Sequence, residues 1–423
     1  MKQTSDSNIL LKRSLLSFGV LIFIRLGTFL PVPGIDQGYL LFYIQQHSLT
    51  RTLVSTFSDN ETFVIGLFTL NIFPYINASI LLQILVTTFP NLAKLQKERS
   101  SESQRTINKL TRLITLIWAF VQSSGIAFYL KRVLFNWTPF LALEIIIWLT
   151  TGSMIVLWLS ELITEYGLGN GTSLLIYTNI VSSLPNLEKR LVDENSASLN
   201  FGACLTIGVL FFIAIFGIVL LQEGIRIIPL ISSKQLLNQK SSNFLILLDN
   251  NYIPLRFNQA GVMPIILTTT VLVVPNYFSN LGLLPALTFP SILQSSKIIY
   301  WISYFVLLLV FSSFYSTIIL NPKDVSDELQ KMAVSIPGIR PGIETTFYLK
   351  QVMKRITVLG AFMLAILATL PNIIEAILPV SSFNGLGTTS LLILVGVILD
   401  LSREIRSIVL SNIYDEMLDL DLD

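Results

Sequence analysis

The chain has 423 residues, of which 52% are hydrophobic and only 13% are charged, against roughly 25% charged residues in a typical soluble domain. This composition excludes an ordinary soluble protein and indicates an integral membrane protein. The formal net charge of +2 decides little, because the placement of charges matters more than their sum. One cysteine (Cys204) and one histidine (His47) exclude a disulfide framework and any metal site that needs several such ligands, so we expect no metal and no cofactor.

Ten apolar segments are close to the length needed to cross a bilayer, about 20 residues each. Their predicted ranges are 15–33, 64–89, 113–131, 139–161, 172–186, 203–222, 260–280, 299–320, 356–378 and 386–401. The fifth and tenth are short and begin after glycines. Ten spans place both ends of the chain on one side of the membrane. Residues 1–14 lead into the first span without a small-residue cleavage site, which predicts no removable signal peptide.

The lysines and arginines of the connecting loops predict the orientation. If the amino end is cytoplasmic or stromal, that side carries 21 of them and the other side carries 6. Cytoplasmic loops of membrane proteins hold the excess of Lys and Arg. We therefore place both ends of the chain on the cytoplasmic or stromal side, called the inner side below.

Residues 71–85 form an apolar run interrupted by Asn71, Pro74, Asn77, Ser79 and Gln83. An unpaired amide in hydrocarbon is costly, and an interior proline leaves a carbonyl without its helical hydrogen bond. One interpretation is a kinked helix whose amides bond neighbouring helices. The other is a helix that lines a water-filled cavity, and the stretch alone leaves both open.

Two long inner loops, 223–259 and 321–355, are polar, basic and punctuated by proline and glycine. The second contains Pro337-Gly338-Ile339-Arg340-Pro341-Gly342, a turn sequence that places one arginine at a loop tip. A hairpin with a solvated arginine is one interpretation. The other is a docking point for a large cytoplasmic partner, since arginine suits both phosphate and carboxylate recognition.

A short internal repeat links the two halves of the sequence. The letters Thr-Ser-Leu-Leu-Ile occur at 172–176 and again at 389–393, each time opening the last span of a five-span half. A chance match is the alternative in a chain so rich in Leu and Ile. Two similar halves with an odd number of spans must insert with opposite topology, and such inverted repeats usually enclose a path at their interface. We therefore expect two halves, 1–190 and 191–423.

Five motifs in order along these spans resemble the SecY family, the central subunit of the protein-conducting channel of bacteria and plastids. The motifs are Arg25 to Ile35, Pro74 to Ile80, Gly169 to Ile176, Asn258 to Pro264 and Ile336 to Gly342. The resemblance covers nearly the whole chain. It implies an all-α membrane protein of ten transmembrane helices in two pseudo-symmetric inverted halves.

The resemblance further implies an hourglass channel with a ring of aliphatic side chains at its waist and a plug below the ring. By position the ring is Ile72, Ile76, Thr172, Ile176, Ile266 and Ile393. Residues four apart share a helical face, and a narrow apolar constriction dewets, so that it bars ions and still yields to a passing chain. The alternative is that these are ordinary core or lipid-facing isoleucines.

The plug is expected near 52–68, and here the chain departs from the family. Residues 55–61, Ser-Thr-Phe-Ser-Asp-Asn-Glu, stand where a glycine-rich stretch is usual. Asn71 stands where the family often has glycine, and Thr172 adds a hydroxyl to an otherwise aliphatic ring. These departures concern the plug geometry and the tightness of the seal.

The resemblance also implies a set of partners and a lateral gate to lipid, which lies between the second and third spans on one side and the seventh and eighth spans on the other. Gln83, Gln122 and Thr269 are the candidate polar gate residues, and Arg226 and Arg340 are candidate contacts for a SecA motor or the ribosome. A SecE-type subunit is expected to clamp the halves, with a SecG-type subunit as an optional addition. The expected cargo is signal peptides and unfolded polypeptides that meet membrane lipid, without sequence-specific nucleic acid.

The main competing hypothesis is a secondary transporter of small solutes, which also shows inverted repeats. An ion-coupled transporter normally carries ionisable groups near the bilayer midplane, and the spans hold few: Arg25, Glu144 and Glu375. A membrane enzyme needs a nucleophile with a base, or paired carboxylates, and the spans offer neither, so we expect no catalytic residues. The compositional bias towards Ile, Asn, Ser and Leu resembles that of plastid-encoded members of the family. It favours the plastid thylakoid membrane as the location, with the bacterial inner membrane as second choice.

Overall fold

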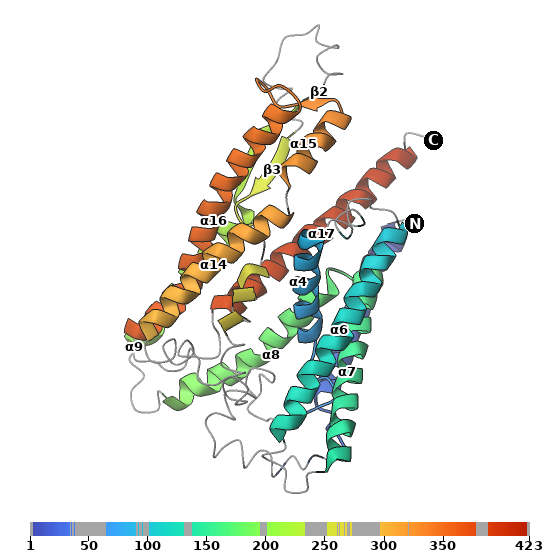
Figure 1. Ribbon diagram of the computed structural model, residues 1–423, viewed down its shortest axis with the longest axis vertical. Coiled ribbons are helices and arrows are strands. Elements are labelled where there is room, and N and C mark those ends of the chain that lie inside the picture. The colour runs from blue at the N-terminus through green and yellow to red at the C-terminus, as the bar shows by residue number, and fades with distance from the viewer. Residues whose placement is uncertain are drawn as a thin grey trace. The chain divides into compact units, whose positions relative to one another are not determined.

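The computed structural model describes residues 3–33, 65–89, 101–130, 138–194, 201–232, 252–259, 297–319, 321–377 and 388–420, with single residues at 35, 38, 92, 95 and 261 and short pieces of 263–272. The chain divides into two compact units (Figure 1). The first unit comprises Met1–Val192 and Val397–Asp423, and the second comprises Asp193–Gly396. The expected boundary at 190/191 is close to this division, while the end of the chain groups with the first unit.

The first unit is built mainly from helices. They are α1 (Gln3–Thr28), α4 (Phe73–Thr88), α6 (Ser101–Leu130), α7 (Pro139–Tyr166), α8 (Gly171–Glu194) and the later part of α17 (Thr388–Leu420). α6 packs against both α4 and α7 (Figure 1). α1 packs against α7. A core cluster that includes Leu70, Ile145 and Leu149 fills the space at one end of these helices.

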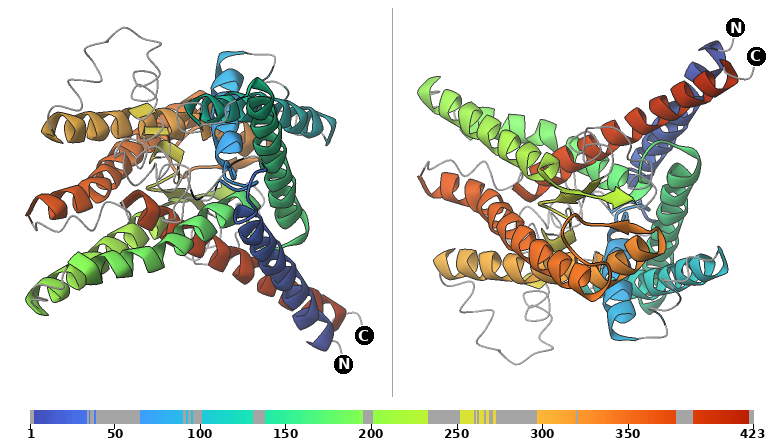
Figure 2. Two further views of the ribbon diagram at one scale, coloured as in Figure 1. Left: turned by 90° about the horizontal axis from the view of Figure 1, so that it is seen from below. Right: turned by 90° about the horizontal axis from the view of Figure 1, so that it is seen from above.

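The second unit combines helices with two small antiparallel ribbons. Its elements are α9 (Phe201–Glu223), β1 (Ile225–Pro229), β2 (Ile231–Ser232), β3 (Tyr252–Arg256), α14 (Lys297–Ile319), α15 (Pro322–Lys331), β4 (Val334–Ser335) and α16 (Ile343–Ile377). β1 pairs with β3 and β2 pairs with β4, with Ile231 opposite Ser335. α14, α9 and α15 all pack against α16, and α14 runs beside it (Figure 2).

Most predicted spans coincide with helices, but several helices continue past the apolar sequence. α6 begins at Ser101, α16 begins at Ile343 and α17 ends at Leu420, each well beyond the predicted span on its inner side. Among the described residues, three helices are long and apolar enough to cross a membrane: Glu102–Phe128, Pro139–Tyr166 and Ile343–Thr369. The seventh predicted span, 260–280, lies largely outside the described residues.

The outer faces of these helices carry large apolar side chains. On α9, Phe212 and Phe216 are 71% and 61% exposed, and Phe140 on α7 is 77% exposed. A soluble protein rarely leaves such contiguous apolar surface in water, whereas hydrocarbon solvates it. The exposure therefore supports the assignment of these helices to the membrane.

The second span differs from its expected form at its amino end. α4 begins at Phe73 rather than near 64, and residues 67–72 form consecutive turns. Pro74 lies in the first turn of the helix, where its missing N–H would have had no helical partner. The interpretation in which Pro74 kinks the interior of a helix is therefore wrong, because Pro74 lies at the start of α4.

The segment that leads into α4 is held tightly by α1 and α7. Leu67 N donates to Leu30 O at 2.9 Å, and Val32 N donates to Ile65 O at 3.1 Å. A Cβ on Gly152 of α7 would collide with the carbonyl oxygen of Leu67, so only glycine allows this approach. The last residues of the predicted plug, 65–68, are thus anchored to the scaffold, and 52–64 lie outside the described residues.

Candidate pore constriction, lateral gate and docking surface

The first two candidate ring residues lie at the start of α4. Ile76 N donates to Ile72 O at 3.1 Å, which closes the first helical turn and places both side chains on one face. Both side chains are buried, with 1% of Ile72 and 4% of Ile76 exposed. A closed constriction requires such burial, but ordinary core isoleucines share it, so burial alone does not assign the ring.

Asn71, directly before Ile72, has a left-handed backbone and a buried side chain. Its φ is +46°, a conformation that glycine adopts freely and that asparagine tolerates better than most residues. Its Nδ2 donates to Asn179 Oδ1 of α8 at 2.9 Å, and its Oδ1 has no hydrogen-bond partner among the described residues. The exchange of a frequent glycine for asparagine therefore keeps the backbone conformation and adds a hydrogen bond between the turn before α4 and α8.

We expect Asn71→Ala to destabilise the protein more than Asn71→Gly does. Glycine loses only the side-chain hydrogen bond, worth about 0.5–1.5 kcal/mol, whereas alanine also meets the left-handed penalty of about 1–2 kcal/mol. The apparent Tm of the purified protein in detergent measures the difference. Equal Tm values for the two variants would contradict the left-handed assignment at this position.

Thr172 and Ile176, the next ring candidates, are half-buried on α8. Asn170 caps this helix, because its Oδ1 accepts from Thr172 N at 3.1 Å and from Thr172 Oγ1 at 2.8 Å. The hydroxyl that departs from an aliphatic ring is thus satisfied by the cap. It adds no unpaired polar group to the constriction.

The turn between α7 and α8 is held from two further helices. Leu168 N donates to Ser17 Oγ of α1 at 2.8 Å, and Gly169 N donates to Glu404 Oε1 of α17 at 3.1 Å. Gly169 has a φ of +80°, which explains a glycine at this place. Sequence reasoning missed Ser17 and Glu404, because neither stands in a motif that announces a partner so distant in the chain.

The remaining ring candidates are only partly described. Ile393 is half-buried on α17, within the residues that group with the second unit. Ile266 lies outside the described residues. The ring as a whole therefore stays a prediction.

The candidate gate residues Gln83 and Gln122 lie on α4 and α6, which pack against each other. Both side chains are half-buried. Gln122 Oε1 is buried and has no hydrogen-bond partner in the part of the chain that the structure describes. Such an acceptor is costly in hydrocarbon, which suits a site that meets a polar group from another helix. Thr269 lies outside the described residues, so the assignment of these three residues to a lateral gate stays a prediction.

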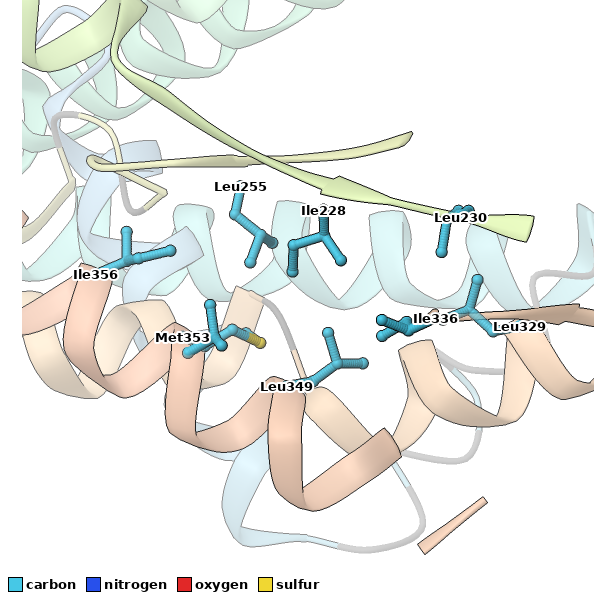
Figure 3. Packing of buried hydrophobic residues seen from close by; sticks show 9 residues of the cluster. Ile228, Leu230, Leu255, Leu329, Ile336, Leu349, Met353 and Ile356 are labelled. Atoms are coloured by element: carbon cyan, nitrogen blue, oxygen red, sulfur yellow. The ribbon is translucent and has the colours of Figure 1, made fainter. Parts of the chain in front are cut away.

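The described parts of the two long inner loops, 223–232 with 252–259 and 321–355, fold together into one body, which we call the docking module after its expected role. It consists of β1 to β4, α15 and residues 343–356 of α16. Side chains from both loops form a single core: Ile228, Leu230, Leu255, Leu329, Ile336, Leu349, Val352, Met353 and Ile356 (Figure 3). Segments from two separate loops therefore share one core and belong to one surface.

Arg340 is exposed on a loop whose backbone is fixed by its neighbours. Gly338 and Gly342 have φ values of +78° and +111°, as the turn sequence requires. Thr345 Oγ1 donates to Arg340 O at 2.8 Å, and Ser326 Oγ of α15 donates to Gly342 O at 2.9 Å. Arg226 is also exposed, on β1, in the same module.

Comparison with known proteins decides the family. A family model described as SecY matches residues 66–402. The chain is 67% identical to protein translocase subunit SecY of Trieres chinensis, over 99% of this chain and 100% of that protein. The chain belongs to the SecY family. SecY of Synechococcus elongatus is 39% identical, over 98% of this chain and 96% of that protein.

Solved SecY-type structures show the same fold. A protein-conducting channel aligns with a TM-score of 0.63 at 18% identity, over 95% of this chain and 93% of that chain. Sec61 from a canine ribosome–channel complex aligns with a TM-score of 0.60 at 17% identity, over the same shares of each chain. The expected all-α membrane fold of SecY type is confirmed. The span count, the pseudo-symmetry and the halves 1–190 and 191–423 stay predictions.

Proposed function

We propose that this chain is the pore-forming subunit of a protein translocase, which conducts unfolded polypeptides across a membrane and releases hydrophobic segments sideways into lipid. The observation that carries the proposal is 67% identity to a protein translocase subunit SecY over essentially the full length of both chains. SecY is a family of multi-pass channels and not of enzymes, in keeping with a chain for which we expect no catalytic residues.

The proposed mechanism divides the work between the waist, the gate and the docking module. The aliphatic ring excludes water and ions at rest, because a narrow apolar neck dewets. Interhelical hydrogen bonds at the gate are worth about 0.6–2 kcal/mol each, weak enough for an arriving signal helix to displace. Arg226 and Arg340 then contact the partner that supplies the driving energy.

The proposed partners are a SecE-type subunit, an optional SecG-type subunit, and SecA or the ribosome as the engine. The likeness to Sec61 in a ribosome–channel complex supports the ribosome, and the docking module with its exposed arginines offers the surface. For the location we propose the thylakoid membrane, with the bacterial inner membrane second. Relatives from Guillardia theta and Synechococcus elongatus support either choice.

Reconstitution into proteoliposomes tests the function directly. With a SecE-type subunit, SecA and ATP, we expect a secretory precursor with a signal peptide to become protected from added protease inside the vesicles. Vesicles that contain the SecE-type subunit alone are the control. Saturable uptake of a small solute without any polypeptide crossing would instead support a secondary transporter and contradict the channel.

A further inference from the structure

The motif Asn258 to Pro264, which opens the seventh span, makes polar contacts that the ring, gate and docking roles do not explain. Ser316 Oγ of α14 donates to Gln259 Oε1 at 3.1 Å. Ser316 Oγ also lies 2.8 Å from Thr357 Oγ1 of α16, within hydrogen-bonding distance. Ser316 and Thr357 are both buried. Three elements of the second unit, the start of the seventh span, α14 and α16, therefore meet at one polar triad.

The number of hydroxyl protons fixes the donor-to-acceptor direction of the hydrogen bonds in the triad. Ser316 has one hydroxyl proton, and it donates that proton to Gln259 Oε1, so Thr357 must donate to Ser316. The chain of donors thus runs from α16 through α14 to the seventh span. Gln259 Nε2 is buried and has no acceptor among the described residues, which leaves this end of the network incomplete.

The triad is joined to the docking module by continuous backbone. α16 runs without a break from Ile343, just after the Arg340 loop, to Ile377, and Ile356 of the module's core directly precedes Thr357. A displacement of the module core is therefore transmitted to Thr357 along a single helix, α16. Packed helices of this kind move as rigid bodies rather than bending freely.

A second path reaches Gln259 from the strands of the module. β3 ends at Arg256, and Phe257 N donates to Gly224 O at 3.0 Å, next to the start of β1. A Cβ on Gly360 of α16 would collide with the carbonyl oxygen of Phe257, so the backbone before Gln259 lies directly against α16. The module's strands and its long helix converge on the residues that begin the seventh span.

We propose that Gln259, Ser316 and Thr357 are positioning residues that couple the docking module to the seventh span, so that a partner bound at the module shifts the gate. This inference rests on the proposed function, in which the seventh and eighth spans form one side of the lateral gate. The triad ties the start of the seventh span to α14, the eighth span. Both elements would then move with α16 as one body.

Purely structural packing would also place three polar side chains together, so the test must measure coupling and not stability alone. In a variant with Cys204 replaced by serine, cysteines at the exposed positions Val121 of α6 and Val306 of α14 carry nitroxide labels. Pulsed electron paramagnetic resonance then measures the distance between the two labels in the reconstituted complex, without and with SecA and ATP. SecA affinity is measured on the same samples.

We expect Ser316→Ala and Thr357→Val to reduce the SecA-induced change in the equilibrium between the two label distances by at least about fivefold, the lower end of typical allosteric coupling, while SecA affinity stays within about twofold of the parent. Thr357→Ser keeps the hydroxyl and should restore the shift. Ser312→Ala, at a buried position one turn earlier on α14, is the matched control and should respond as the parent does.

The outcomes separate the two proposals. Triad variants that respond as fully as Ser312→Ala would overturn the coupling, and so would a shift lost only in proportion to lost SecA affinity. A parent that binds SecA and translocates but shows no change in label distance would overturn the coupling while leaving the translocase intact. A parent that neither binds SecA nor translocates would overturn the proposed function and the coupling with it.

Discussion

Replacing Ile76 and Ile176 together by glycine should raise the resting ion leak of the closed channel by about tenfold or more. The two side chains come from different helices, α4 and α8. In the proposed ring, removing both widens the neck and lets water enter. A barrier lowered by only about 1.4 kcal/mol already gives a tenfold higher rate. Single-channel recordings in planar bilayers, made without SecA or ribosomes, measure the leak.

The matched control uses the same two helices at positions away from the expected pore. Ile84 of α4 is 43% exposed and Val181 of α8 is 37% exposed, so Ile84→Gly with Val181→Gly removes comparable side chains. Glycine costs each helix about 1 kcal/mol in both variants, which cancels the propensity effect. An unchanged leak in the ring variant, or an equal rise in the control, would show that these isoleucines do not form the constriction.

Hydropathy located most membrane helices but not their lengths. A hydropathy pattern reports where a helix meets lipid, so it detects 356–378 but not the continuation of α16 back to Ile343, where Lys350 and Lys354 are exposed. The extension is stabilised by the core of the docking module, a tertiary contact between two loops that no local pattern encodes. The start of α4 was missed for a similar reason, since the turns before it depend on glycines of α1 and α7.

Candidate site residues also fall into two groups: those that local sequence patterns can place and those that depend on contacts between distant parts of the chain. Arg340 could be placed at an exposed tip from sequence, because proline and glycine restrict the backbone locally. The bond between Asn71 and Asn179 joins residues 108 positions apart, and the bond between Ser316 and Thr357 joins residues 41 apart. Such pairs leave no periodic signal. Ring isoleucines could be selected only through the family motifs, because isoleucine is common throughout the spans.

Arg340→Glu should abolish most SecA-driven translocation and weaken partner binding at least about thirtyfold, since loss of a central interfacial arginine typically costs about 2 kcal/mol or more. The substitution leaves the loop itself intact. The two bonds that hold it, from Thr345 Oγ1 and Ser326 Oγ, end on the backbone carbonyls of Arg340 and Gly342 and do not involve the arginine side chain. The effect should therefore come from the reversed charge and not from a collapsed docking module.

Lys323→Glu provides the comparison that separates a specific contact from a general loss of positive charge. Lys323 is exposed on α15 in the same module, and its replacement changes the net charge by the same amount. A distant exposed charge alters mainly the association rate and its salt dependence, whereas a desolvated contact alters the dissociation rate. We expect Arg340→Glu to raise the dissociation rate of SecA in surface plasmon resonance and Lys323→Glu to leave it nearly unchanged. Equal effects of the two variants, or unaltered translocation and ribosome binding in Arg340→Glu, would remove Arg340 from the docking surface.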